Sequence, residues 1–452
     1  MLKQSTTHHF EDTEFLSKNI LEREGRDVFW LRPTDVAQCP VFEHEGNVTY
    51  YSNESLTEDS FLFLCVAAAL KKADKLPIWP AYRSSEEGDY FNGRLEAKFY
   101  RNGVPGQFNI DDLLPYTNFQ GSFAAVFSYG LNSNEFWISY LEKAYTKFLG
   151  SHALVFGKSI FELLSEMSGC IVEKLRIKYK SVDREWAIYN IKTLMKEYDC
   201  FGLAKSEDLW VIFEKDPNPR SRHKEDVELF PLRYGAVPSI IDSVTMNGDT
   251  GGIKPTILDA ESLVQSVDDL MFCWFPCPKL HTKSIVSYWM CGKNSGGPQF
   301  EPSYYTNPQI KLLVHEDFPE QDDDEIKSQI LIQVELLRPH YGTLAAKVFK
   351  ASQTRDHLTM KRLPSRFLRP DNVYLASEST EKFNKPWVTL RISWARDGDV
   401  FFIVPNLPVK EMCGGFRVKV MSSVVISELE ETKGCKGTEN VPRCRKGTCA
   451  RL

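Results

Sequence analysis

The sequence predicts an α+β protein in which a mixed helical and stranded first part precedes an all-β last part. Apolar residues recur at helical spacing in residues 60–70 and 135–149. Between these segments, residues 95–99 alternate apolar and polar side chains as a half-buried strand does. From His281 to Val425, short alternating segments rich in Val, Ile, Phe and Trp follow one another with turns between them, which is typical of a β-sandwich.

The composition is that of a soluble globular protein with several domains. The 452 residues suggest two to four domains, and 42% of them are apolar and 26% charged. A formal net charge of -6 argues against a general nucleic-acid binder, which usually presents a basic face. The segment Met1–Phe15 is polar and acidic, so no secretory signal is expected, and no apolar stretch is long enough to predict a transmembrane segment. An odd number of cysteines, 11, placed mostly inside hydrophobic segments, predicts a reducing, cytoplasmic location.

Two helices are expected in the first part. Glu58, Asp59 and Ser60 can begin the first helix, because Asp and Ser side chains accept hydrogen bonds from the free N–H groups of a first turn. The second helix is expected over Glu135–Leu149, and Gly150 is placed to end it. The predicted apolar face of this second helix consists of Phe136, Tyr140, Leu141, Ala144, Tyr145 and Phe148.

Further elements follow the same two periodicities. A hairpin is expected with its turn at Gly103–Gly106 and its second strand at Gln107–Leu114. Helical patterns cover Glu185–Tyr198 and Ala260–Phe272, and a strand is expected at Leu209–Glu214.

Several short blocks occur in a fixed order along the chain. These blocks are Phe10–Phe15, Trp30–Pro33, Glu54–Leu64, Tyr90–Phe99, Ile110–Pro115 and Asn134–Lys147. The last block is similar to the Ser-Glu-Phe-Trp-x-x-Leu-Leu-Glu-Lys-Ala-Tyr-Ala-Lys of calpains. Ser295–Gly297, Thr306–Gln309 and Phe402–Pro405 resemble the calpain C2-like domain. The chain therefore resembles the calpain family over roughly residues 10–425, without the Ca²⁺-binding loop pattern of an EF-hand.

The resemblance implies a papain-like calpain protease core followed by an all-β, C2-like sandwich. The core would have two subdomains, the first α-rich and the second β-rich and shortened. The expected bounds are an N-terminal segment at 1–25, core subdomains at 26–168 and 169–280, the C2-like domain at 281–425, and a disordered basic tail at 426–452.

The catalytic set implied by the resemblance is degenerate. A papain-like protease needs a cysteine at a helix N-terminus, a histidine base, an asparagine that orients this base, and a glutamine that donates to the oxyanion. The resemblance places Ser60 at the cysteine position, Ala236 at the histidine position and Glu54 at the glutamine position. No counterpart of the asparagine block is found between Asp249 and Ala260. Because such residues act as a unit, no intact catalytic residue is expected, and Ser60 is interpreted as a helix cap.

Other reactive side chains offer few substitutes. Cys65 lies about one helical turn beyond Ser60 in an apolar run and is expected in the core. His223, His281 and His340 are expected to be solvated or structural. The pair Cys273 and Cys277 lacks a second pair of ligands at zinc spacing, and no metal site is assigned.

One acidic run concentrates negative charge in the last part of the chain. Its carboxylates are Glu316, Asp317, Glu320, Asp322, Asp323, Asp324 and Glu325. Calpain C2-like domains carry an acidic loop at the corresponding place, so the resemblance implies an electrostatic contact or weak Ca²⁺ binding there. Carboxylates are suitable ligands for Ca²⁺, and a plain solvated loop is the alternative.

These observations favour a calpain-like pseudoprotease that works by binding. Its expected partners are cytoskeletal proteins, an active calpain or its substrates, or membrane phospholipid bound through the C2-like domain. One alternative is a diverged intracellular calpain-type cysteine endopeptidase that uses Ser60 or Cys65. Another is a Ca²⁺-dependent adaptor built on residues 281–425.

Overall fold

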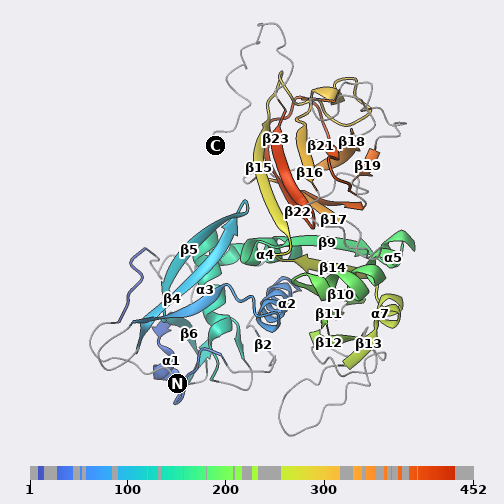
Figure 1. The fold of residues 1–452 in the computed structure, drawn as a ribbon. Helices are drawn as coiled ribbons and strands as arrows, with labels where there is room; N and C mark the ends of the chain where they lie inside the picture. The colour runs from blue at the N-terminus through green and yellow to red at the C-terminus, as the bar shows by residue number, and fades with distance from the viewer. Residues whose placement is uncertain are drawn as a thin grey trace. The chain divides into compact units, whose positions relative to one another are not determined.

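Figure 1 shows the computed structural model of the chain, residues 1–452. The residues described are 9–14, 28–43, 51–52, 58–83, 90–119, 121–130, 134–155, 157–179, 181–206, 209–215, 226–232, 256–315, 329–337, 343–351, 361–363, 368, 375–378, 386–393 and 395–432. The chain divides into two compact units, residues 1–170 with 174–273, and residues 171–173 with 274–452. Helices and strands mix in the first unit, which confirms the predicted α+β class.

The first half of the first unit consists of small antiparallel sheets packed against helices. The sheets have the orders β3-β4-β5, β1-β6-β7 and β2-β8. The strands are β1 (Val28–Leu31), β2 (Tyr51–Ser52), β3 (Ile78–Arg83), β4 (Tyr90–Arg101), β5 (Val104–Asp111), β6 (Leu114–Phe119), β7 (Ser122–Ala125) and β8 (Tyr129–Gly130). The helices are α1 (Pro33–Val36), α2 (Glu58–Lys72), α3 (Trp137–Leu149) and α4 (Ile160–Ser168).

Helices α2 and α3 confirm two of the predictions. Helix α2 begins at Glu58, and α3 ends where Gly150 donates its N–H to the carbonyl oxygen of Thr146 at 2.8 Å. Helix α3 packs against β4 and β5. It is buried on almost every side rather than on one apolar face, so that Glu142 and Lys143 are enclosed together with the aromatic residues.

The β4–β5 hairpin turns earlier than predicted. Arg101 pairs with Val104, which leaves only Asn102 and Gly103 in the turn. Both have positive φ, 50° and 64°, as a two-residue turn of the twisted type I′ requires. The predicted turn at Gly103–Gly106 is therefore wrong, because Val104–Gly106 already belong to β5.

The second half of the first unit is built on a six-stranded sheet of order β13-β12-β11-β10-β14-β9. Its strands are β9 (Ile171–Arg176), β10 (Cys200–Ser206), β11 (Leu209–Lys215), β12 (Asp226–Leu232), β13 (Thr256–Asp259) and β14 (Asp269–Trp274). Residues 171–173 of β9 and Trp274 of β14 are grouped with the second unit. The predicted strand at Leu209–Glu214 is confirmed as β11.

The helices of this half differ in how well the sequence predicted them. Helix α5 (Ser181–Tyr189), a π-helical turn at Asn190–Leu194 and α6 (Met195–Glu197) form one helical run, as predicted but with an earlier start. Helix α7 covers only Ala260–Ser266, so the predicted helix through Phe272 is wrong. The apolar run after Ser266 becomes strand β14 instead, because a short apolar run fits a buried strand as well as a helix.

The second unit is a sandwich of two antiparallel sheets, which confirms the predicted all-β last part. The sandwich extends past the predicted bound at residue 425, because residues 426–431, expected in a disordered tail, belong to a strand that pairs with Ile310–His315. The sheet orders are β15-β22-β17-β20 and β19-β18-β21-β16-β23. The strands are β15 (His281–Trp289), β16 (Ile310–His315), β17 (Gln329–Leu336), β18 (Ala345–Lys350), β19 (Leu375–Glu378), β20 (Trp387–Ser393), β21 (Val400–Asn406), β22 (Gly414–Ser422) and β23 (Val425–Glu431).

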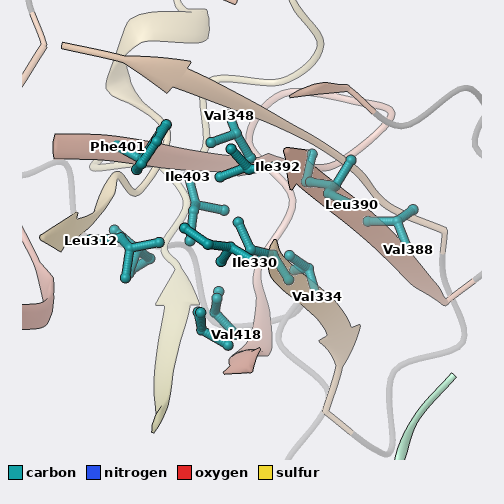
Figure 2. Packing of buried hydrophobic residues seen from close by; sticks show 14 of the residues in the cluster. Leu312, Ile330, Val334, Val348, Val388, Leu390, Ile392, Phe401, Ile403 and Val418 are labelled. Atoms are coloured by element: carbon teal, nitrogen blue, oxygen red, sulfur yellow. The ribbon is translucent and has the colours of Figure 1, made fainter. Parts of the chain in front are cut away.

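The core of the sandwich consists of side chains from both sheets. Figure 2 shows aliphatic residues of β17 and β20 facing residues of β16, β18 and β21. Ile332 and Ile403 are fully buried in this cluster. The alternation seen in the sequence thus corresponds to one inward face on each sheet.

Among the described residues, no helix is both long and apolar enough to cross a membrane.

Candidate functional site

Helix α2 contains Ser60, the residue that the sequence resemblance predicts at the nucleophile position. The helix starts at Glu58, so Ser60 is its third residue and lies in the first turn. Free N–H groups give a helix N-terminus partial positive charge, which is the environment in which a cysteine protease holds its thiolate. At this place the sequence supplies a hydroxyl group.

The other predicted site residues lie outside the described residues. Glu54 and Ala236 are among them, as are His223 and His340. The same holds for the acidic run of Glu316, Asp317, Glu320, Asp322, Asp323, Asp324 and Glu325. Their part in the site remains a prediction from the sequence.

Cys65 lies on the enclosed side of α2, two turns from the helix start. Its side chain is buried, and this burial raises the pKa of the thiol well above its usual value. A thiolate is the nucleophilic form of cysteine, and nothing favours it here. Cys65 therefore lies in the core, as predicted.

The remaining predicted candidates do not form a site. His281 is exposed at the start of β15. Cys273 is buried in β14, and its pKa is raised by burial, whereas Cys277 is partly exposed. In the part of the chain that the structure describes, no group of three His, Cys, Asp or Glu side chains is placed to hold a metal ion.

The first unit instead contains a buried ionic network around α3. The ammonium group of Lys143 forms an ion pair with Asp111 and donates to the carbonyl oxygens of Asp111 and Leu113 at 3.0 and 2.6 Å. The side chain of Lys143 is only 2% exposed. Desolvation lowers the pKa of Lys143, and the charge and hydrogen bond of Asp111 oppose this shift. The buried surroundings of Lys143 disfavour its charged form, and the interactions with Asp111 favour it.

The network extends one turn along α3 to Lys147. Its ammonium group lies 2.8 Å from both carboxylate oxygens of Asp12 and donates to the carbonyl oxygen of Asn109 at 2.8 Å. The backbone N–H of Asp12 donates to the carboxylate of Asp111 at 2.9 Å. Two lysines and two aspartates therefore join the N-terminal segment, the end of β5 and α3.

Further contacts bring the remaining sequence blocks to the same helix. Arg32 forms an ion pair with Asp112, and the ring of Trp30 lies 5.4 Å from the ammonium group of Lys143. On the other side of α3, Tyr145 packs against two other rings, Phe63 of α2 at 6.3 Å and Phe99 of β4 at 5.4 Å.

Residues of the other five sequence blocks therefore lie around α3, which is formed by the block Asn134–Lys147. Phe10–Phe15, Trp30–Pro33 and Ile110–Pro115 contribute the charges, and Glu54–Leu64 and Tyr90–Phe99 contribute aromatic packing. Several residues of these blocks therefore have a structural role, because they join neighbouring elements to α3. The sequence analysis left Lys143 off the apolar face of the helix, because a charged residue is almost never fully buried unless it has a partner. The spacing of apolar residues does not show that partner.

Two more buried pairs escaped the sequence reasoning. Glu142 of α3 accepts a hydrogen bond from the backbone N–H of Ser128 at 2.7 Å and lies 2.7 Å from Nε2 of His152. Lys71 at the end of α2 pairs with Glu135 and lies 5.1 Å from the ring centre of Trp137. Both pairs join neighbouring elements. The glutamates and lysines of the block Asn134–Lys147 were the feature of the sequence that could have indicated these pairs.

The comparison with protein families agrees with this scaffold. Residues 10–208 match the family described as calpain family cysteine protease. This region belongs to the calpain family. It contains all six blocks and the whole of the network around α3.

Individual relatives are calpains of animals. The chain is 30% identical to Calpain clp-1 of Caenorhabditis elegans over 175 residues, which is 37% of this chain and 22% of the relative. It is 29% identical to Calpain-A of Drosophila melanogaster over 174 residues, 37% of this chain and 20% of the relative. Calpain-9 of Mus musculus is 28% identical over 173 residues, 37% of this chain and 24% of that protein. The chain thus matches about a fifth of the length of these calpains.

Proposed function

We propose that this calpain-family chain is a pseudoprotease that acts by binding other molecules rather than by cleaving peptides. The observation that carries the proposal is a contrast within residues 10–208. The buried ionic network around α3 is present, whereas the residue that the family resemblance aligns with the nucleophile is Ser60, a serine in the first turn of α2. A buried Cys65 with a raised pKa offers no replacement thiolate.

The sequence alignment extends the same contrast to the rest of the catalytic set. At the base position Ala236 has no side-chain proton acceptor, and at the oxyanion position an ionised Glu54 would repel developing negative charge. Losing nucleophile, base and oxyanion donor together removes nearly all catalysis, because these groups act as a unit.

The proposed domain organisation follows the family. Residues 26–168 and 169–280 would be the two core subdomains, and residues 281–425 would be a C2-like domain. Cytoskeletal proteins, an active calpain or its substrates, or phospholipid would then bind in the cytoplasm. The acidic run from Glu316 to Glu325 would supply electrostatic contacts or a weak Ca²⁺ site.

A casein-cleavage assay with Ca²⁺ tests the proposal. The wild-type chain, Ser60→Ala, Ser60→Cys and the triple variant Glu54→Gln/Ser60→Cys/Ala236→His are compared, with Cys65→Ala as the matched control for the buried thiol. We expect no cleavage by the wild type above the Ser60→Ala background.

The alternative, a diverged endopeptidase, predicts a different pattern. Wild-type cleavage of casein that is lost in Ser60→Ala or in Cys65→Ala would overturn the proposal. Labelling of Ser60 by a fluorophosphonate, or of Cys65 by an epoxysuccinyl probe, would do the same. Cleavage by the triple variant alone would support a scaffold that retains its shape.

A further inference from the structure

Two exposed cysteines meet at one end of the sandwich in the second unit. Strands β15 and β22 pair in register up to Trp289 opposite Gly414. The chain therefore leaves β15 and enters β22 side by side. Cys291 follows β15 and Cys413 precedes β22, and both residues are exposed.

The two cysteines are in direct contact. The backbone N–H of Cys291 donates to Sγ of Cys413 at 3.3 Å. The Cβ atom of Cys291 is two bonds from this backbone nitrogen, so the two side chains start close to each other. A disulfide needs a sulfur–sulfur distance of about 2.0 Å and a Cβ–Cβ distance of roughly 4 Å, which residues on adjacent chains of a sheet can reach.

Other contacts hold the two turns against each other. The N–H of Glu411 donates to the carbonyl oxygen of Ser295 at 3.0 Å. A Cβ at Gly297 would lie 2.8 Å from the backbone nitrogen of Lys410, so the two backbones touch at this point. Asn294 closes the first turn by accepting from the N–H of Met290 at 2.6 Å. The cysteines therefore stay near each other without a covalent bond.

We propose that Cys291 and Cys413 form a reversible disulfide when the protein meets a hydroperoxide. One thiolate attacks the O–O bond of the peroxide, which gives a sulfenic acid and releases hydroxide or alkoxide. The second thiolate then attacks the sulfenic sulfur, so that the S–S bond forms and the S–O bond breaks with loss of hydroxide. The two thiol protons end on the departing oxygens, and for hydrogen peroxide the products are one disulfide and two waters.

A second pair of neighbouring cysteines, in the first unit, is buried rather than exposed and serves as a comparison. Cys170 and Cys273 share a side-chain hydrogen bond and are both buried. Burial, reinforced by Cys170, raises the pKa of Cys273. Proximity is thus present in both pairs, but of the two only the pair Cys291 and Cys413 is exposed to a peroxide in solution.

The disulfide would fasten an edge strand. Strand β15 is the first strand of its sheet and pairs with β22 along one side. Its C-terminal end continues directly to Cys291. A covalent bond from there to Cys413 would prevent this end from separating from β22, and a thiol reductant would release it.

Peptide mapping of the full-length chain tests the proposal. Dilute protein is treated with a small excess of hydrogen peroxide, blocked with iodoacetamide, digested without reduction and analysed by mass spectrometry. We expect a linked Cys291–Cys413 peptide that disappears on dithiothreitol treatment. Cys170 and Cys273 are expected as unlinked peptides.

Matched variants decide the interpretation. Cys291→Ser and Cys413→Ser must each abolish the linked peptide, whereas Cys39→Ser, which removes another exposed thiol, must leave it unchanged. If the disulfide holds β15 against β22, peroxide should slow hydrogen exchange of the β15 peptide in the wild type and not in Cys291→Ser. The proposal is wrong if peroxide leaves both thiols alkylated, oxidises them separately, or links them to other cysteines or a second chain.

Discussion

The interior around α3 and the interior of the sandwich are held together by different interactions. Around α3, the buried lysines Lys143 and Lys147 bind Asp111 and Asp12 within an aromatic shell. In the sandwich, aliphatic and aromatic side chains of both sheets pack together around Ile332 and Ile403. Ion pairs depend on geometry and protonation, whereas aliphatic packing depends on volume. The α3 region should therefore be sensitive to single charge changes and to pH, and the sandwich core should respond to changes in side-chain size.

Removing one charge of the α3 network should give the largest effect. Lys143→Met leaves the Asp111 carboxylate buried without its partner, and we expect a loss of about 3–5 kcal/mol of unfolding free energy. Urea unfolding, with hydrogen exchange of α3 peptides to locate the change, measures this loss.

Lys75→Met provides the control for this experiment. Lys75 pairs with Asp199 at 2.7 Å, but both side chains are about a third exposed, so the loss should be below about 1 kcal/mol. Equal losses in the two variants would contradict the idea that the α3 network is a buried structural interaction.

A change of one methyl group in the sandwich should have an intermediate effect. Ile332→Val removes buried volume from the aliphatic cluster and should lower the unfolding free energy by about 0.5–1.5 kcal/mol. No titratable group is changed, so the loss should be the same at neutral and alkaline pH.

Val286→Ala is the matched control on the outer side of β15. Val286 is 43% exposed, and its truncation should stay within about 0.5 kcal/mol. If the loss of stability in Ile332→Val varied with pH, the packing of the sandwich interior would depend on titratable groups. That result would contradict the proposed difference between the sandwich and the α3 region.

The smallest effect is expected for Tyr140→Phe and should appear only at alkaline pH. Burial raises the pKa of Tyr140 well above its usual value, so the folded state keeps a proton that the unfolded state releases above about pH 10. This contribution to stability is complete below that pH and is lost as the pH rises further. The variant should therefore lose less stability in alkali than the wild type.

At neutral pH the same variant should be neutral or slightly stabilising. The hydroxyl of Tyr140 is buried and has no hydrogen-bond partner among the described residues. Tyr288→Phe, at a 53% exposed position, serves as the control in urea unfolding at neutral and alkaline pH. If Tyr140→Phe and the wild type lost the same stability at alkaline pH, the raised pKa of Tyr140 would not contribute to the pH dependence of stability.

The sequence predicted elements whose signals are local. Helix α3 and its end at Gly150 follow from spacing and capping. Helix α2 follows from spacing, and it begins at Glu58, so Ser60 is its third residue rather than the residue before its first turn. The β4–β5 turn was predicted wrongly although the Asn102-Gly103 pair carries a local signal for a two-residue turn. The end of α7 could not be predicted from a local signal. Residues 269–274 form β14 because they pair with neighbouring strands of the sheet.

The buried charges could not be predicted from periodicity. Lys143 and Lys147 are one turn apart in a pattern that would suit the solvated side of an amphipathic helix. Their partners come from Asp111 and Asp12, which are distant in sequence, so only the tertiary structure reveals that the lysines are enclosed. The degenerate catalytic positions were inferred from the family pattern, since a single sequence does not show which hydroxyl stands in place of a thiol.

The pairing of Asp12 with Lys147 also constrains when the chain can fold during synthesis. The two residues are 135 positions apart. While the ribosome has delivered only the N-terminal segment and the first sheets, Asp12 and Asp111 have no lysine to neutralise them. The first half of the unit can close only after α3 has left the exit tunnel, so its folding should be late, cooperative and exposed to chaperones until that moment.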